Sequence, residues 1–373
     1  MKTRCFIMKR PTGIPLIDCH FHLTLTRYMS QFSNAEDVRR VMEACELDAI
    51  NVQNITLWYT RNLARNPVSL YTKLENAKKV YSFGGVIFPD PEAPDKHFDY
   101  AEQALELLEL GFDGIKLFGK PTIRREFGEE FCSPVFYELF DTLEKRGTPV
   151  LFHMGDPEEF WDGEKVSDFA RKAGWYYGEG GFPSYEKLYE ETRAVMERNP
   201  RLNIVFPHFF FLSADLARCA QFLDDFPSLK IDITPGTEMY PNFSANAEAA
   251  RAFFIRYQDR ILLGTDNTGV SKESPFDCAA AASAHLEKIL AFLTGERCAG
   301  FENDTLSGLH LPEDVVRKIC HDNFVRFVSP APKAVDRAGA ARYTARMIER
   351  ARARGDHNDV IPELEKTLRA IEG

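Results

Sequence analysis

The sequence predicts an α/β chain whose strand–helix units close into a parallel (β/α)8 barrel of the TIM type. Eight apolar, strand-like runs alternate with segments of helical spacing. Strands that alternate with helices pair in parallel under a helical cover. Histidine or aspartate stands at the end of several of these runs, and the carboxyl ends of the strands are where such barrels carry their chemistry.

The strand-like runs are short and rich in aliphatic or aromatic residues. In chain order they are Ile14–Cys19, Ala49–Ile55, Tyr81–Phe88, Gly114–Phe118, Pro149–His153, Asn203–Pro207, Leu229–Thr234 and Ile261–Thr265. Between and after them, apolar residues three and four positions apart predict helices with one buried face. These helices are Ala35–Cys45, Asp99–Leu110, Ser133–Lys145, Tyr185–Arg198, Ala214–Asp225, Ala245–Gln258 and Ala281–Leu293.

An open, doubly wound sheet is the alternative way to arrange these units. It binds ligands at a switch point, usually with a glycine-rich first turn. The first run here ends in Cys19-His20-Phe21-His22, which contains no glycine. The closed barrel is therefore the preferred prediction.

We expect one barrel domain over residues 1–329 and a helical extension over residues 330–373. The extension is polar and rich in Ala, Arg and Glu, so it either wraps the barrel or meets another subunit of a homo-oligomer. Residues 154–184, after the fifth strand, form an unusually long loop with a hinge-like stretch at Gly178–Gly181. This loop either closes over the site as a lid or packs on the rim as an extra helix, Lys165–Ala173.

Composition excludes several classes of partner. The net charge of −10 argues against nucleic acid. No run has the length of a membrane helix or of a signal peptide, so we expect a cytoplasmic protein with a small-molecule substrate and no membrane partner. The eight cysteines are scattered, which is typical of free thiols that pack as small apolar groups.

The strand-end residues predict a metal site. His20 and His22 are two positions apart on a strand and therefore share a face, and Asp18 on that face is expected to orient an imidazole. His153 and Asp266 end the fifth and eighth runs. Three imidazoles and one carboxylate suit one divalent ion, Zn²⁺ first and Mn²⁺ or Fe²⁺ as alternatives. Such an ion lowers the pKa of a bound water towards about 7.

Three residues are the predicted catalytic groups. Asp266 would take or relay a proton from that water. His208 ends the sixth run before Phe209-Phe210-Phe211, and it is either a further ligand or a base that contacts the water or the substrate. Lys116 lies within the fourth run, where it is a substrate anchor, a structural ion-pair partner or a carboxylated bridge between two metals.

Arginine and aromatic residues after the strands indicate the substrate. Arginine binds carboxylates through paired donors, and aromatic rings supply apolar walls, so an organic acid is expected. Each arginine alone has the alternative of a surface ion pair. The predicted substrate-binding residues are Arg61, Trp161, Glu238 and Arg124, with Arg27, Arg65, Arg125, Trp58, Tyr59 and Tyr240 as further candidates.

The motifs at these strand ends resemble the amidohydrolase superfamily, and within it the amidohydrolase 2 branch of metal-dependent hydrolases and decarboxylases. The resemblance runs roughly from Ile17 to Phe327 and depends on the motifs at 17–22, 114–117, 150–153, 207–208, 262–266 and 318–323. It implies one divalent metal, often zinc, held by His20, His22, His153 and Asp266. It also implies that His208 is the catalytic imidazole.

Three functions follow as hypotheses. The first is hydrolysis of a C–N, C–O or C–C bond by a metal-activated water in a small, carboxylate-bearing substrate. The second is non-oxidative decarboxylation of an aromatic or unsaturated acid, since the ligand set does not separate the two reactions. The third is a barrel without catalytic activity that binds a ligand or a metal structurally.

Overall fold

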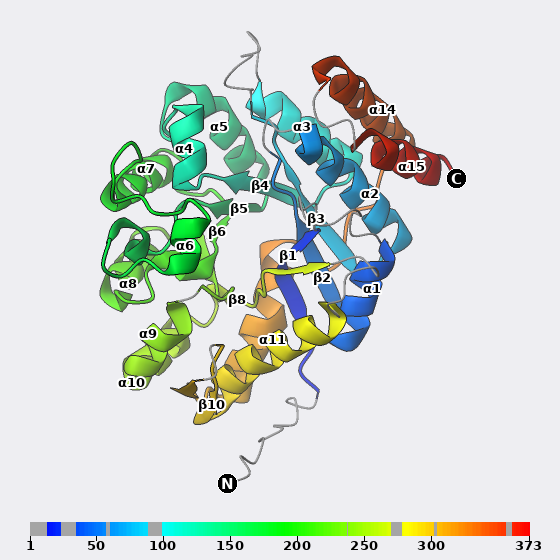
Figure 1. Cartoon of the computed structure of the whole chain (residues 1–373). Coiled ribbons are helices and arrows are strands. Elements are labelled where there is room, and N and C mark those ends of the chain that lie inside the picture. Colours follow the sequence, from blue (N-terminus) through cyan, green and yellow to red (C-terminus); the bar gives the residue numbers. More distant parts are fainter. Residues whose placement is uncertain are drawn as a thin grey trace.

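The structure is a computed structural model that describes residues 13–23, 35–56, 60–88, 99–236, 238–269, 278–301, 304–355 and 360–373. Eight parallel strands form a ring, and helices surround it (Figure 1). The strands are β1 (Ile17–Leu23), β2 (Ala49–Gln53), β3 (Val80–Gly85), β4 (Gly114–Phe118), β5 (Val150–His153), β6 (Ile204–Phe206), β7 (Leu229–Asp232) and β8 (Ile261–Leu262).

The ring closes between β8 and β1. A further short strand, β9 (Asn267–Gly269), continues the chain beyond β8 and pairs in parallel with the end of β1. Two backbone hydrogen bonds complete the seam: the Cys19 N–H donates to the Leu263 carbonyl at 2.9 Å, and the Asp266 N–H donates to the His20 carbonyl at 2.8 Å. The predicted (β/α)8 barrel is therefore confirmed, and the open sheet is excluded.

The outer layer consists mainly of helices that follow the strands. They are α1 (Ala35–Ala44), α2 (Arg65–Glu75), α3 (Tyr100–Leu110), α5 (Tyr137–Arg146), α7 (Tyr185–Arg198), α8 (Leu216–Asp225), α9 (Met239–Ala245), α10 (Ala247–Arg256) and α11 (Cys278–Thr294). Sequence periodicity missed α2 because its buried face carries the polar residues Ser69, Thr72 and Lys73. The predicted helix Ala245–Gln258 is interrupted at Asn246, whose side chain accepts from the Ala249 N–H and begins α10.

One end of the barrel is filled with apolar side chains. Phe324 and Phe327 of α13 (Asn323–Phe327) pack among inward-facing strand residues such as Cys19 and Leu262. The Asn323 amide donates to the carbonyl groups of Gln258 at 2.7 Å and Ile261 at 2.6 Å, which holds α13 against the start of β8. The polar strand residues are therefore concentrated towards the opposite, carboxyl end. Cys19, Cys132, Cys219, Cys298 and Cys320 form no disulfide within the described part of the chain, as predicted.

The long loop after β5 packs on the rim around its own apolar cluster. Phe160, Val166, Ala170 and Tyr177 form the centre of this cluster, and the extra helix is shorter than predicted, α6 (Asp168–Lys172). The Tyr177 hydroxyl donates to Asp156 at 2.5 Å. The packed interpretation accounts for these contacts, and opening of the loop as a lid stays a prediction.

The C-terminal extension forms two helices, α14 (Arg337–Arg354) and α15 (Val360–Glu372), which lie outside the barrel beside α2 and α3 (Figure 1). The Asn66 amide donates to the Tyr343 hydroxyl at 3.1 Å, and the Lys333 N–H donates to Asp113 at 2.7 Å. The extension thus wraps the barrel. Among the described helices, none has the length and apolar character needed to cross a membrane.

Candidate active site

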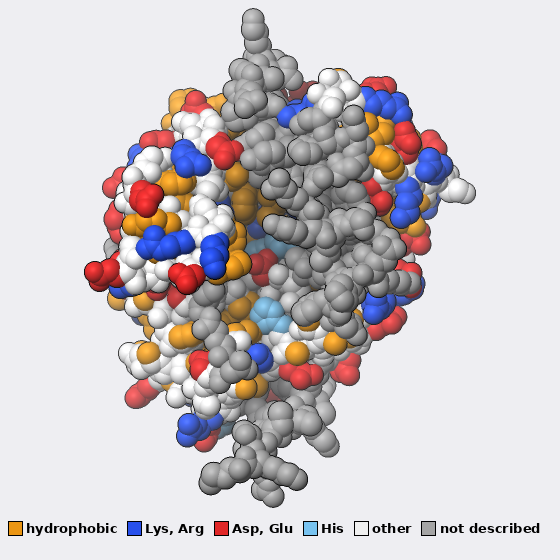
Figure 2. All heavy atoms as spheres, viewed as in Figure 1, with side chains coloured by type: hydrophobic (Ala, Val, Ile, Leu, Met, Phe, Trp, Pro, Cys, Tyr) orange, Lys and Arg blue, Asp and Glu red, His pale blue; other side chains and the backbone are white. Residues whose placement is uncertain are grey.

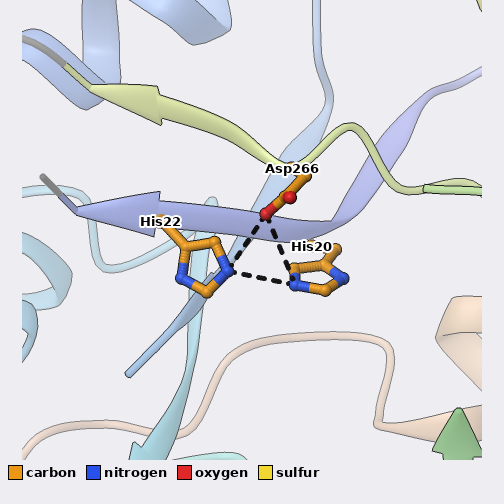
Figure 3. Close-up of side chains that lie close together, drawn as sticks. All are labelled: His20, His22 and Asp266. Carbon is orange, nitrogen blue, oxygen red and sulfur yellow. Dashed lines mark hydrogen bonds and ion pairs between the residues drawn. The ribbon is translucent and has the colours of Figure 1, made fainter. Parts of the chain in front are cut away.

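Three of the predicted metal ligands lie together at the carboxyl end of the barrel. The Nε2 atoms of His20 and His22 are 3.1 Å apart. The Oδ1 atom of Asp266 lies 3.2 Å from Nε2 of His22 and 3.8 Å from Nε2 of His20 (Figure 3). The space-filling view shows histidine side chains near the centre of this face (Figure 2).

Hydrogen bonds on the far side of each ring fix where its proton lies. Nδ1 of His20 is 3.1 Å from Oδ2 of Asp232, and Nδ1 of His22 is 2.9 Å from the Gln53 carbonyl oxygen. The Gln53 carbonyl can only accept. Burial raises the pKa of the Asp232 carboxyl, but the backbone N–H groups of His208 and Thr234 favour its ionised form, which accepts as well. Each Nδ1 therefore carries the proton and each Nε2 presents a lone pair. The two lone pairs and a carboxylate oxygen therefore converge without a proton between them.

A cation fits this arrangement better than a proton does. Burial lowers the pKa of both imidazoles, and the nearby Lys116 contributes to the shift, so neither ring gains a proton easily. Zinc–ligand distances of about 2.0–2.2 Å in a tetrahedral site place ligand atoms roughly 3.4 Å apart. The three observed separations lie around that value. His20, His22 and Asp266 thus fit a single divalent ion.

Asp266 is held in an unusual backbone conformation between β8 and β9. Its φ is 54°, which is left-handed and uncommon for a residue other than glycine. Asp18 supports this bend, since its carboxylate accepts from the Thr265 N–H at 3.1 Å and the Thr265 hydroxyl at 2.5 Å. Desolvation opposes ionisation of Asp266, but the adjacent imidazoles outweigh it and hold its pKa below the usual range. Asp266 is therefore a carboxylate at neutral pH.

A bulge in β1 changes what alternation predicts for this strand. Asp18 pairs with Ile50, but the next pairs join Phe21 to Val52, so β1 contains one extra residue. The expectation that Asp18 orients an imidazole is wrong: besides Thr265, it binds the His20 N–H at 3.0 Å. The Cys19 sulfur lies 3.8 Å from Oδ2 of Asp232, on the same side of the strand as the site.

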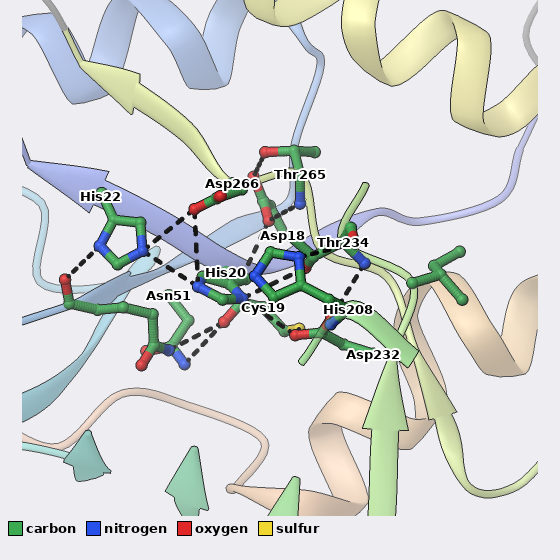
Figure 4. A network of polar contacts seen from close by, with 12 residues as sticks. Asp18, Cys19, His20, His22, Asn51, His208, Asp232, Thr234, Thr265 and Asp266 are labelled. Carbon is green, nitrogen blue, oxygen red and sulfur yellow. Dashed lines mark hydrogen bonds and ion pairs between the residues drawn. The ribbon is translucent and has the colours of Figure 1, made fainter. Parts of the chain in front are cut away.

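His208 is placed beside the ligand group by a left-handed turn. Residues His208 to Phe211 have φ angles of 55°, 54°, 59° and 56°. Nδ1 of His208 donates to the Thr234 carbonyl at 3.2 Å, which leaves a lone pair on Nε2 (Figure 4). Burial lowers the pKa of His208 to about 4, with His153 adding to the effect, so the ring is a neutral acceptor at neutral pH.

Packing of the three phenylalanines holds this turn. Left-handed residues cost about 1–2 kcal/mol each, so the surroundings must compensate for four in a row. Phe209 packs on Phe243 with 4.6 Å between ring centroids, and Phe210 stacks on Phe206 at 4.4 Å. Phe211 stacks on His208 itself at 5.2 Å. The triple-phenylalanine run thus gives the His208 turn its apolar support.

His153 and Lys116 lie near the group but outside it. The ring of His153 is 5.0 Å from that of His208. Its Nε2 is buried, lies 3.9 Å from Oδ1 of Asp156 and has no partner at hydrogen-bond distance in the described part of the chain. Lys116 is only 2% exposed, and its Nζ also has no partner within the described ranges, which does not support the structural ion pair. Burial lowers the pKa of Lys116 to about 7, although Asp266 and Asp232 oppose the shift.

Comparison with known proteins identifies the family. A family model described as amidohydrolase, of the amidohydrolase 2 type, matches residues 17–329. The chain belongs to the amidohydrolase family. The resemblance drawn from the strand-end motifs is therefore confirmed. No curated protein sequence matches this amidohydrolase.

Solved structures share the fold of this amidohydrolase at low sequence identity. 5-Carboxyvanillate decarboxylase LigW from Sphingomonas paucimobilis is 14% identical with a TM-score of 0.51, over 85% of this chain and 99% of that one. 4-Oxalomesaconate hydratase LigJ from Rhodopseudomonas palustris is 13% identical with a TM-score of 0.51, over 84% and 95%. A putative amidohydrolase from Staphylococcus aureus is 14% identical with a TM-score of 0.51, over 84% and 99%.

The predicted substrate-binding residues of the amidohydrolase are dispersed. Arg124 is paired with Glu191 of α7 at 2.6 Å, in a buried ion pair and not in the surface pair given as the alternative. Trp161 donates from Nε1 to the Pro183 carbonyl at 3.0 Å within the loop cluster. Glu238 lines a rim hollow of about 220 Å³ together with Phe211.

The remaining predicted substrate-binding residues either lie outside the described residues or belong to the core. Arg61 belongs to the 3-10 helix η1 (Thr60–Ala64), but its side chain lies outside the described residues, as do Arg27, Trp58 and Tyr59. Tyr240 is fully buried, and its hydroxyl donates to the Ile233 carbonyl at 2.9 Å, so it serves the core.

Sequence reasoning missed one functional residue, Asp232. It ends β7 within the apolar run Leu229–Thr234, at 0% exposure. Its carboxylate contacts His20 and the backbone N–H of His208 (Figure 4). An acid at a strand end was the available signal, the same one that identified Asp266.

Proposed function

We propose that this amidohydrolase is a metal-dependent hydrolase of a small, carboxylate-bearing substrate. The observation that carries the proposal is the proton-free convergence of His20 Nε2, His22 Nε2 and Asp266 Oδ1 within 3.8 Å of one another. These three residues would hold the ion, with buried His153 Nε2 as a fourth donor. Zinc suits this set best, with Mn²⁺ or Fe²⁺ as alternatives.

A divalent ion in this position supplies a water nucleophile near neutral pH and polarises the bond to be cleaved. Asp266 is the most accessible member of the group, with its side chain 41% exposed, and it is ionised. It would receive the proton of the attacking water. His208, neutral and with a lone pair on Nε2, would orient that water or accept a hydrogen bond from the substrate.

Lys116 would anchor the substrate through a carboxylate. A buried ammonium group without a hydrogen-bond partner in the described part of the chain lacks a counter-charge in direct contact, and a substrate carboxylate would supply one. The metal-bridging role predicted as an alternative for a carboxylated Lys116 would instead require a second ion. Trp161 and Glu238, at the rim, would contact the distal part of the substrate.

Non-oxidative decarboxylation is the second candidate. The position of Lys116 is compatible with it, because an ammonium group near the ligand group could hold a carboxylate that is lost as well as the carboxylate of a hydrolysed substrate. The fold similarity to 5-carboxyvanillate decarboxylase LigW adds support at 14% identity. Both candidates share the same metal ligands, so the products decide between them.

The test begins with metal content. The purified wild-type chain, reconstituted with zinc, should bind one ion per chain, and His22→Ala should bind none while keeping its circular dichroism spectrum. The loaded enzyme is then screened against aromatic and unsaturated carboxylic acids in ¹⁸O-labelled water. Incorporation of ¹⁸O into the cleaved product supports hydrolysis, whereas release of carbon dioxide without ¹⁸O in the organic product identifies the lyase. A wild-type chain that binds no divalent metal would refute both.

A further inference from the structure

We propose that Asp232 is a positioning residue that sets the tautomer of His20 and seats His208 at the same time. The inference rests on the proposed function, since it assumes that His20 is a metal ligand. It assigns to one buried carboxylate the control of both the metal affinity and the placement of the catalytic imidazole.

The two carboxylate oxygens of Asp232 accept hydrogen bonds from different groups. Oδ1 accepts two backbone N–H groups, from His208 at 2.9 Å and from Thr234 at 3.0 Å. Oδ2 accepts from Nδ1 of His20 at 3.1 Å, and the Cys19 thiol lies 3.8 Å from it. Asp232 is fully buried, so water does not replace any of these contacts. One side chain on β7 therefore joins a ligand on β1 to the turn after β6 (Figure 4).

The groups around Asp232 require that both of its oxygens act as hydrogen-bond acceptors. The two backbone N–H groups are permanent donors, so the atom that faces them must be an acceptor. The atom that faces His20 must also be an acceptor if Nδ1 is to carry the proton. Only an ionised carboxylate offers two acceptor atoms, whereas an amide offers one acceptor and one donor.

Substitution of Asp232 by Asn has a predictable consequence. The two N–H groups would select the amide oxygen, and the amide NH₂ would then face Nδ1 of His20. That donor favours the tautomer in which His20 carries its proton on Nε2, which is the atom that faces His22 and Asp266. A protonated Nε2 has no lone pair for a metal. Among the described residues, the Thr234 hydroxyl, 3.3 Å from Nδ1 of His20, is the neighbour that would still accept from the original tautomer.

Zinc affinity tests the proposal. Competition with a chromophoric chelator should show that Asp232→Asn binds zinc roughly 10- to 100-fold more weakly than the wild type, as for other carboxylates that orient a ligating histidine. The double variant Asp232→Asn/Thr234→Val should bind more weakly still. Circular dichroism and urea midpoints report whether each variant is folded.

Glu191→Gln is the matched control, because Glu191 is another buried carboxylate, which accepts from Arg124 at 2.6 Å and from the Phe131 N–H at 3.0 Å. It should lose stability but keep the zinc affinity of the wild type. Equal zinc affinity in the wild type and in folded Asp232→Asn would overturn the inference while leaving the metal site intact. Absence of zinc binding in the wild type would instead refute the proposed function.

A second measurement needs no altered Asp232. In metal-free wild-type protein labelled with ¹⁵N-histidine, the His20 signals, assigned by their loss in His20→Gln, should show a protonated Nδ1 and an unprotonated Nε2. A proton on Nε2 of His20 would contradict the proposal even if Asp232→Asn fails to fold.

Discussion

Replacement of Lys116 by Met should make the metal-free protein more stable against unfolding. The same substitution should abolish the activity of the metal-loaded enzyme. Lys116 is 2% exposed and has no hydrogen-bond partner among the described residues, so its charge is desolvated with only partial compensation from Asp266 and Asp232. Burial lowers its pKa from 10.5 to about 7. Since one pKa unit corresponds to about 1.4 kcal/mol, the protonated form costs the folded state roughly 5 kcal/mol at most. Methionine has a similar length and no charge to bury.

The sign of the effect follows from proton linkage. Between pH 7 and 10.5 the unfolded chain holds a proton on Lys116 that the folded protein has lost, so the stability of the wild type rises with pH in that window. The cost is complete below about pH 7 and disappears above 10.5. Lys116→Met should therefore raise the free energy of unfolding by up to about 5 kcal/mol at pH 6, and by only about 2 kcal/mol at pH 9.

Urea unfolding of the metal-free protein, followed by tryptophan fluorescence at both pH values, measures these differences. Lys73→Met is the matched control, because Lys73 is also a buried lysine of the barrel but is paired with Asp113. Removal of one partner from a buried pair should destabilise the fold by about 3–5 kcal/mol, the opposite sign. If Lys116→Met is no more stable than the wild type at pH 6, or if its gain is the same at both pH values, the assignment of an incompletely compensated buried charge is wrong.

Three further results are expected. Asp266→Ala should lose bound zinc, measured by elemental analysis, yet keep the wild-type circular dichroism; a full complement of zinc would remove Asp266 from the ligand set. Asn323→Ala leaves the buried Ile261 carbonyl and the part-buried Gln258 carbonyl without their donor and should lower the unfolding free energy by about 1–3 kcal/mol; an unchanged urea midpoint would contradict this. Tyr177→Phe removes a hydrogen bond to Asp156 and should speed hydrogen exchange roughly tenfold within residues 154–184 alone; uniform or unchanged exchange would argue against a local latch.

Much of the fold was predictable because its signals are local. The strand β4 and the helix α7 have the bounds that their apolar patterns predict, Gly114–Phe118 and Tyr185–Arg198. Helix α2 was not predictable in this way, because Lys73 and its polar neighbours are buried by partners distant in sequence. Lys73, for example, finds its partner Asp113 only in the folded barrel.

The site was predictable as a set of residue types and less so as a geometry. Strand-end positions identified His20, His22 and Asp266, which the barrel seam brings within reach of one another. The same reasoning expected His153 in the group, but the structure places it beside His208 instead. Strand positions give the end of the barrel where a side chain lies, and they do not give its distance from residues on other strands.

The sequence by itself determined the alternation of strands and helices, the polar residues at the strand ends and the family motifs, since each of these is a pattern along the chain. Only the tertiary structure decided the bulge that realigns β1, the left-handed turn that carries His208 and the carboxylate of Asp232 that joins the two. These features depend on β1, β6 and β7 belonging to one closed ring. In that ring, side-chain packing and the hydrogen bonds accepted by Asp232 outweigh the local conformational preferences of each residue.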